Sequence, residues 1–243
     1  MSECEGTYRT TAEFYDILQA ERDSRLVARL YGARVAAARG AVVDVGAGSG
    51  AVSFLALTAS GVPVHAVEPS AVMRSLLLTR LARCGADRRA RVTVHPGTLP
   101  EADITAGEAE LVVCHNVVPT LDGAARRALW EAAARVLGPG GLLLMDRPRA
   151  RAPREAEVTA FTPVRVGADT YEGEVRETAC AEGAELAFTY TVRRGERVVR
   201  RRGERFLTRM LPLEALAEEL GECGLRWEET GERVLVARRA GAG

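Results

Sequence analysis

A cluster of glycines with an acid ahead of it stands in the stretch VVDVGAGSG, residues 42–50. Gly46, Gly48 and Gly50 occupy alternate positions, and Asp44 lies two residues before the first of them. Glycine in such a place lets the backbone turn tightly and lets another group lie against it. One interpretation is the GxGxxG/A fingerprint of a dinucleotide, whose pyrophosphate binds at a helix N-terminus, but the pattern alone is weak evidence. Another is a turn that only joins a strand to a helix.

A second acid, Glu68, follows the apolar stretch in VHAVEPS and lies eighteen positions after Gly50. A carboxylate at the end of a second strand can accept hydrogen bonds from both hydroxyls of a ribose. Enzymes that bind NAD also place an acid there, so Glu68 does not choose between nucleotides. The alternative is a carboxylate at the start of a helix, facing the helix dipole.

His115 and Asn116 stand at the end of another apolar stretch, in LVVCHNVV. Ligands of open parallel sheets bind at the carboxyl ends of the strands, so both residues are candidates for a binding site. His115 could act there as a general base or as a ligand of the substrate. A purely structural role, or one carried by the backbone, is the alternative for this position.

Strands and helices alternate between residues 41 and 146, which indicates a parallel sheet covered by helices on both faces and wound right-handed. The strands are nearly all apolar, as in sheets that are buried on both faces. Two helices precede the sheet, and in the first of them Tyr8 and Tyr15 would share a face. The predicted helices are 8–20, 24–39, 50–61, 70–85 and 123–137, and the predicted strands are 41–45, 63–67, 91–95, 110–114 and 142–146.

The pattern changes after Arg147, where a connector rich in proline and arginine, RPRARAPRE, leads into segments that alternate with period two. These segments predict an antiparallel insertion of three or four strands. On its middle strand, 184–195, one face would carry Leu186, Phe188, Tyr190 and Val192. A helix at 212–223 and a hairpin at 224–239 follow.

The amino-acid composition excludes some classes of binding partner and of structural site. The chain has 243 residues with 33 basic and 33 acidic side chains, so its charge supports neither a nucleic-acid partner nor an anionic membrane. Five scattered cysteines without a CxxC pair argue against a metal site and a disulfide scaffold, and favour reduced thiols in a cytoplasm. Neither a signal peptide nor a bilayer-spanning run is expected. The basic side chains are all arginine, a bias typical of a bacterium with a GC-rich genome.

From about residue 38 to residue 146, and again at the terminal hairpin, the sequence resembles the class I S-adenosylmethionine-dependent methyltransferases. The resemblance rests on Asp44 with its three glycines, on Glu68, and on LVVCHNVVPTL followed by RVLGPGGLLLM in the family's order and spacing. It implies a Rossmann-like sheet whose last strand is antiparallel. One departure is HPGTLPE, where Thr98 stands in place of the acid that meets the adenine amino group.

The resemblance also implies roles for particular residues. S-adenosylmethionine would be the cofactor, and no metal is implied. In related small-molecule enzymes an N-terminal helix closes over the cofactor and an aromatic residue lines the methyl site, which makes Tyr15, with His115, a catalytic candidate. The cofactor-binding candidates are Tyr8, Tyr15, Asp44, Gly46, Ala47, Gly48, Gly50, Glu68, Pro69, Thr98, Leu99, His115 and Asn116.

The resulting prediction is methyl transfer to a nitrogen, oxygen or carbon atom of a small molecule in bacterial secondary metabolism. Residues 1–38 would form a helical cap, 39–147 and 211–240 the cofactor domain, and 148–210 an insertion at the acceptor site or at a homodimer interface. One alternative is an NAD-dependent oxidoreductase, although the absence of lysine excludes a Tyr-Lys catalytic pair. The other is a protein that binds S-adenosylmethionine without transferring its methyl group.

Overall fold

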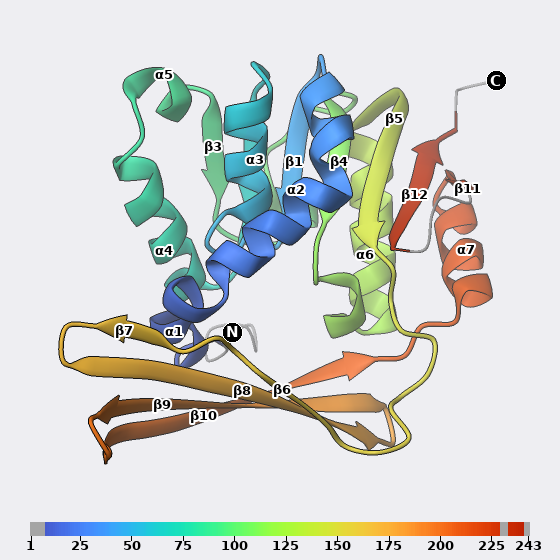
Figure 1. The fold of residues 1–243 in the computed structure, drawn as a ribbon. Helices are drawn as coiled ribbons and strands as arrows, with labels where there is room; N and C mark the ends of the chain where they lie inside the picture. The colour runs from blue at the N-terminus through green and yellow to red at the C-terminus, as the bar shows by residue number, and fades with distance from the viewer. Residues whose placement is uncertain (1–7, 229–232, 241–243) are drawn as a thin grey trace.

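The computed structural model describes residues 8–228 and 233–240, which form a seven-stranded sheet with helices on both faces and a separate five-stranded antiparallel sheet. In Figure 1 the antiparallel sheet lies below the seven-stranded sheet, on the side toward which the arrowhead of β5 points. Residues 1–7 of the predicted cap and residues 229–232 in the predicted hairpin lie outside the described residues.

The seven-stranded sheet has the order β11-β12-β5-β4-β1-β2-β3. In this spatial order the five neighbouring strands β5, β4, β1, β2 and β3 pair in parallel. Strand β12 runs antiparallel to both of its neighbours, β5 and β11. This confirms the predicted fold class, including the antiparallel last strand. The strands are β1 (Ala41–Val45), β2 (Val64–Val67), β3 (Val92–His95), β4 (Ala109–Cys114), β5 (Leu137–Asp146), β11 (Leu225–Glu228) and β12 (Val234–Arg239).

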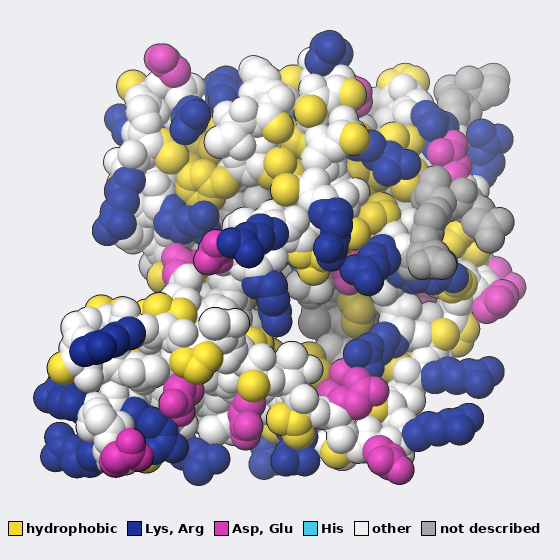
Figure 2. All heavy atoms as spheres, in the orientation of Figure 1, with side chains coloured by type: hydrophobic (Ala, Val, Ile, Leu, Met, Phe, Trp, Pro, Cys, Tyr) yellow, Lys and Arg dark blue, Asp and Glu magenta, His cyan; other side chains and the backbone are white. Residues whose placement is uncertain are grey.

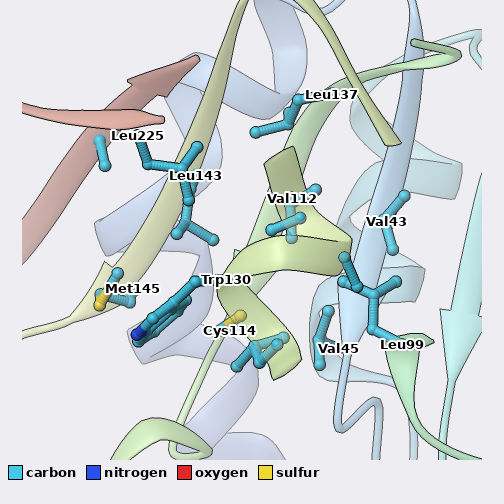
Figure 3. Packing of buried hydrophobic residues seen from close by; sticks show 14 of the residues in the cluster. Val43, Val45, Leu99, Val112, Cys114, Trp130, Leu137, Leu143, Met145 and Leu225 are labelled. Carbon is cyan, nitrogen blue, oxygen red and sulfur yellow. The ribbon is translucent and has the colours of Figure 1, made fainter. Parts of the chain in front are cut away.

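Two hydrophobic cores lie on opposite faces of this sheet. On β4, Val112 packs in one core and its neighbour Val113 in the other, because successive side chains of a strand point to opposite faces. Helices α2 (Ala20–Ala37), α3 (Ala51–Ala59) and α4 (Ala71–Ala82) supply one core, and α6 (Gly123–Val136) with α7 (Leu213–Glu222) the other. Figure 3 shows the fully buried Trp130 of α6 beside Met145 of β5 and Cys114 of β4. None of the described helices is long and apolar enough to cross a membrane.

Several predicted boundaries differ from the structure; α2, for example, begins at Ala20 instead of residue 24. The first helix, α1, spans Thr11–Leu18 instead of 8–20, and Tyr8 precedes it with a φ of 70°, so Tyr8 and Tyr15 do not share a helix face. The strand predicted at 142–146 begins at Leu137, directly after α6. The GPGG segment forms a bulge within β5, where the pairing with β4 jumps from Leu137 to Leu142.

The antiparallel sheet has five strands rather than the predicted three or four. They are β6 (Glu157–Ala160), β7 (Val164–Val166), β8 (Asp169–Cys180), β9 (Gly183–Arg194) and β10 (Arg197–Arg209). Short helices α5 (Ala86–Arg89), η2 (Leu99–Glu101) and η3 (Val118–Thr120) complete the described elements.

Helix α1 is fastened to one face of the antiparallel sheet. The ring of Phe14 stacks on that of Tyr190 with centroids 4.6 Å apart, and the Tyr190 hydroxyl bonds the side chains of Thr11 and Gln19. Glu204 of β10 accepts the backbone N–H of Thr11 at 2.7 Å. The sheet therefore holds α1, and the start of α2 behind it, at the edge where the strands of the larger sheet end (Figure 1).

Candidate functional site

The glycine loop after β1 needs its glycines for two different reasons. Gly46, Gly48 and Gly50 have φ values of 65°, 57° and 100°, in the region that favours glycine. A Cβ on Gly46 would lie 2.4 Å from the Val117 side chain, and one on Gly50 would lie 2.6 Å from that of Leu77. Gly48 has room on that side, since the nearest atom to its Cβ would be 3.6 Å away. The loop is thus tightly packed at Gly46 and Gly50 and less so at Gly48.

Asp44 lies buried beneath this loop, at the end of β1. Its Oδ2 accepts the backbone N–H of Ser53 at 2.8 Å and the Ser53 hydroxyl at 2.7 Å, so it caps the first turn of α3. Burial, with the nearby charge of Glu68, raises the pKa of Asp44 to about 7, while the bonds from Ser53 oppose the rise. Ala47 fastens the loop to β2 through a bond from its N–H to the carbonyl of Val67, 3.0 Å long.

Glu68 joins the ends of β1 and β2. One of its oxygens accepts the N–H of Gly48 at 2.7 Å and the other accepts the N–H of Ser70 at 2.7 Å. Burial raises the pKa of Glu68, and the two backbone bonds oppose the rise. Ser70, not Glu68, caps α4, and Arg74 donates to the carbonyls of Glu68 and Pro69. Both oxygens keep lone pairs for further donors, as ribose hydroxyls would be.

The two carboxylates decide what kind of ligand suits this loop. A pyrophosphate needs free N–H donors and positive charge, but Asp44 takes the N–H of Ser53 and Glu68 takes that of Gly48. Buried negative charge next to the loop repels phosphate and attracts a cation. The residues present therefore fit the methionine half of S-adenosylmethionine, with its ammonium and sulfonium groups, better than they fit a pyrophosphate.

The loop after β3 contains an acid that the sequence analysis missed. Thr98 donates both its N–H and its hydroxyl to Oε2 of Glu101, each at 2.7 Å. These bonds lower the pKa of Glu101. The side chain of Leu99 points into the core, where it is 1% exposed. Thr98 and Glu101 thus form a capping box at the start of the 3-10 helix LPE, and the spacing of three residues between a threonine and a glutamate is the signal that could have found Glu101.

His115 and Asn116 lie at the end of β4 with two partners from elsewhere in the chain. Nδ1 of His115 lies 3.2 Å from the hydroxyl of Tyr31 on α2 and 3.6 Å from Oδ1 of Asp146, the last residue of β5. Burial lowers the pKa of His115, against the raising effect of the Asp146 and Asp23 carboxylates. Asp146 stands at a strand end, where a site residue is expected. Nothing in the sequence pattern singles out Tyr31.

The two N-terminal tyrosines occupy different surroundings. Tyr15 donates its hydroxyl to Oδ2 of Asp23 at 2.7 Å, and burial with this carboxylate raises its pKa. The charge of Asp23 also acts on His115, where it opposes the lowering of the imidazole pKa by burial. Tyr8 stacks on Phe206 of β10 with centroids 4.7 Å apart. The structure thus gives Tyr15 a carboxylate partner on α2 and gives Tyr8 an aromatic partner on the antiparallel sheet.

A cavity of about 270 Å³ opens beside His115 and Asn116. Apolar side chains of α2 form one wall, and the end of β5 forms another. Neither Tyr8 nor Tyr15 lines it, and the wider hollow between the two sheets is visible in Figure 2 with arginines at its rim. The lining residues are Leu26, Leu30, His115, Asn116, Asp146, Arg147, Pro148 and Arg233.

Comparison with known proteins agrees with the chemistry of this site. Residues 43–143 match the family model described as a methyltransferase domain. No curated protein sequence matches the chain.

Solved structures of similar fold include three bacterial methyltransferases. CcbJ from Streptomyces caelestis has a TM-score of 0.73 at 20% identity, over 98% of this chain and 100% of that one. The sugar N-methyltransferase KedS8 from a Streptoalloteichus species has a TM-score of 0.71 at 17% identity, over 99% and 95%. CalS10, an S-adenosylmethionine-bound amino pentose methyltransferase of calicheamicin biosynthesis from Micromonospora echinaspora, has a TM-score of 0.69 at 22% identity, over 91% of both chains.

Proposed function

We propose that the chain is a class I S-adenosylmethionine-dependent methyltransferase that methylates a small molecule bound where β4 and β5 end. The acceptor atom is a nitrogen, oxygen or carbon nucleophile. Two kinds of observation support a small acceptor: the cavity beside His115 holds about 270 Å³, and the similar structures are named as sugar and amino pentose methyltransferases.

The main support for the cofactor site is the hydrogen bond from the Gly48 N–H to the Glu68 carboxylate. It puts a buried carboxylate against the one glycine of the loop at which an added Cβ would not overlap a neighbour. We propose that Gly46, Ala47, Gly48 and Gly50 present bare backbone to the methionine half, above Asp44. Glu68 would accept the ribose hydroxyls, next to Pro69, and the loop of Thr98 and Leu99, with Glu101, would border the adenine.

When bound, S-adenosylmethionine supplies a methyl group already activated by its sulfonium, so the chain mainly has to align the acceptor and exclude water. Holding two reactants in line can contribute roughly 7–11 kcal/mol of the barrier. His115 is the candidate base for an acceptor that arrives protonated, and Tyr15, bonded to Asp23, is the second catalytic candidate. The antiparallel sheet would complete the acceptor site by holding α1, or join two copies of the chain. Cys84, Cys114, Cys180 and Cys223 are free thiols, which supports a cytoplasmic location.

The proposal is tested by calorimetric titration with S-adenosylmethionine, S-adenosylhomocysteine and NAD. We expect micromolar binding of the first two and none of NAD, followed by S-adenosylhomocysteine formation when a panel of amines, alcohols and amino sugars is added. Binding of NAD alone would identify an oxidoreductase instead. Binding of S-adenosylmethionine without turnover of any acceptor would support a binding protein.

The affinity for S-adenosylmethionine is expected to depend on pH through Asp44. Because the pKa of Asp44 is about 7, its ionised fraction rises from about a tenth at pH 6 to about three quarters at pH 7.5. A cationic ligand favours the ionised form, so its binding releases a proton and its affinity rises about fivefold to tenfold over this range. Titration in buffers of different ionisation enthalpy measures both quantities. In Asp44→Asn the rise is expected to disappear, and an unchanged slope in that variant would contradict the assignment.

A further inference from the structure

Asp146 makes two contacts with the end of β4 that the proposed transfer reaction does not by itself explain. Its Oδ1 accepts the backbone N–H of Asn116 at 2.6 Å and lies 3.6 Å from Nδ1 of His115. Asn116 has a φ of 58°, a left-handed conformation that non-glycine residues rarely adopt and that often marks a functional site. The carboxylate thus stabilises a strained turn and faces the imidazole at the same time.

Three neighbours act on the protonation of His115. The hydroxyl of Tyr31, 3.2 Å from Nδ1, can donate to an unprotonated Nδ1 or accept from Nδ1–H, so it fits either tautomer. The side-chain amide nitrogen of Asn116 lies 3.3 Å from Nε2, where its N–H can donate to a lone pair. The Asp146 carboxylate favours the proton on Nδ1, because negative charge stabilises the nearer N–H. Only the Nδ1–H tautomer leaves Nε2 with a lone pair, and therefore able to accept a proton.

We propose that Asp146 is a positioning residue that holds His115 in the Nδ1–H tautomer, with an Nε2 lone pair that faces the Asn116 amide until the acceptor replaces it. This inference rests on the proposed function for its purpose. An amine or hydroxyl acceptor that gains a methyl group must lose a proton, and Nε2 takes it. His115 then becomes an imidazolium whose positive charge the Asp146 carboxylate balances, as in other carboxylate–histidine pairs.

Other charged groups around His115 do not replace Asp146 in this role. Asp23 of α2 also raises the pKa of His115, but it is already bonded to Tyr15 and to Arg22. Arg147 and Arg233 line the same cavity and carry positive charge, which opposes an imidazolium. Asp146 is the carboxylate with an oxygen within 4 Å of an imidazole nitrogen of His115 among the described residues.

Asp146→Asn separates the two functions of the side chain. Its amide oxygen can still accept the N–H of Asn116, so the left-handed turn keeps its support, while the negative charge facing His115 is lost. Tyr31→Phe is the complementary variant, because it removes the hydroxyl next to Nδ1 and leaves the carboxylate in place. Asp87→Asn, on the exposed α5, removes a charge of the same kind far from the cavity and serves as the matched control.

The direct test is ¹⁵N NMR of the histidine side chains in the full chain without ligand, where three histidines give few signals. Loss of signals in His115→Gln assigns those of His115. We expect Nδ1–H in the native chain, in Tyr31→Phe and in Asp87→Asn, and Nε2–H in Asp146→Asn. An Nε2–H tautomer in the native chain, or no change in Asp146→Asn, would overturn the proposal. So would a change in Tyr31→Phe.

Kinetics give a second readout once an acceptor is found. In Asp146→Asn we expect kcat near pH 7 to fall about 100-fold, the size of a general-base contribution, with little change in KM for S-adenosylmethionine. The acidic limb of the kcat profile is expected to shift to lower pH, because loss of the carboxylate lowers the pKa of His115 further. Asp146→Glu should recover part of the rate. If Asp146 had a purely structural role, the acidic limb of the kcat profile would not shift in Asp146→Asn, and that result would contradict the proposal. If no acceptor is methylated, the proposed function fails, but the NMR experiment still tests the role of Asp146.

Discussion

Replacing Glu68 by alanine is expected to weaken S-adenosylmethionine binding about 100-fold or more. Hydrogen bonds to a charged group contribute about 1.5–3 kcal/mol each, and Glu68 would accept two from the ribose. The variant also frees the Gly48 and Ser70 N–H groups that the carboxylate now holds, so the loop loses its link to β2. Calorimetric titration measures the affinity, and thermal unfolding without ligand measures what the fold itself loses.

Glu110→Ala is the control for that experiment. Glu110, at the start of β4, accepts the N–H groups of Arg39 and Gly40 at 2.7 and 2.6 Å, so it also bridges two backbone amides. It does so at the opposite end of the strands from the glycine loop. We expect the control to lower the free energy of unfolding without changing the affinity. Equal losses of affinity in both variants would mean that Glu68 acts only through stability.

The glycine loop and Glu68 could be predicted from sequence because their positions follow from local rules. A buried strand, a tight turn and a helix fix where Asp44 and Gly46 to Gly50 lie, and the next strand ends beside them in any parallel sheet. The fold class followed from the same alternation. Their contacts with each other, such as Glu68 on the Gly48 N–H, are consequences of that arrangement.

The residues around His115 could be predicted only in part, because they depend on distant packing. Tyr31 reaches His115 only since α2 crosses the face of the sheet over β4, and helix periodicity cannot set that crossing. Asp146 obeys the strand-end rule but gains its role from the turn at Asn116. Tyr8 was misplaced because its left-handed backbone starts the helix later than the apolar pattern indicates.

Gly46→Ala and Gly48→Ala are expected to fail in different ways, although both glycines have positive φ. An alanine costs about 1–2 kcal/mol in this conformation at either position. At Gly46 its Cβ would also overlap the Val117 side chain, which adds about 1–3 kcal/mol. We therefore expect Gly46→Ala to lower the melting temperature by about 6–12 °C, and Gly48→Ala by about half as much or less.

Ligand affinity is expected to show the reverse order. A methyl group on Gly48 would crowd a cofactor that lies against this backbone, so binding of S-adenosylmethionine should weaken more than tenfold in a chain that remains folded, because the Cβ itself overlaps no neighbour. Adding Val117→Ala to Gly46→Ala should restore part of the melting temperature, because it removes the overlap and leaves only the backbone cost. Normal affinity in Gly48→Ala would contradict a ligand against Gly48. If adding Val117→Ala to Gly46→Ala did not restore any of the melting temperature, close packing against Val117 would not explain why position 46 requires glycine.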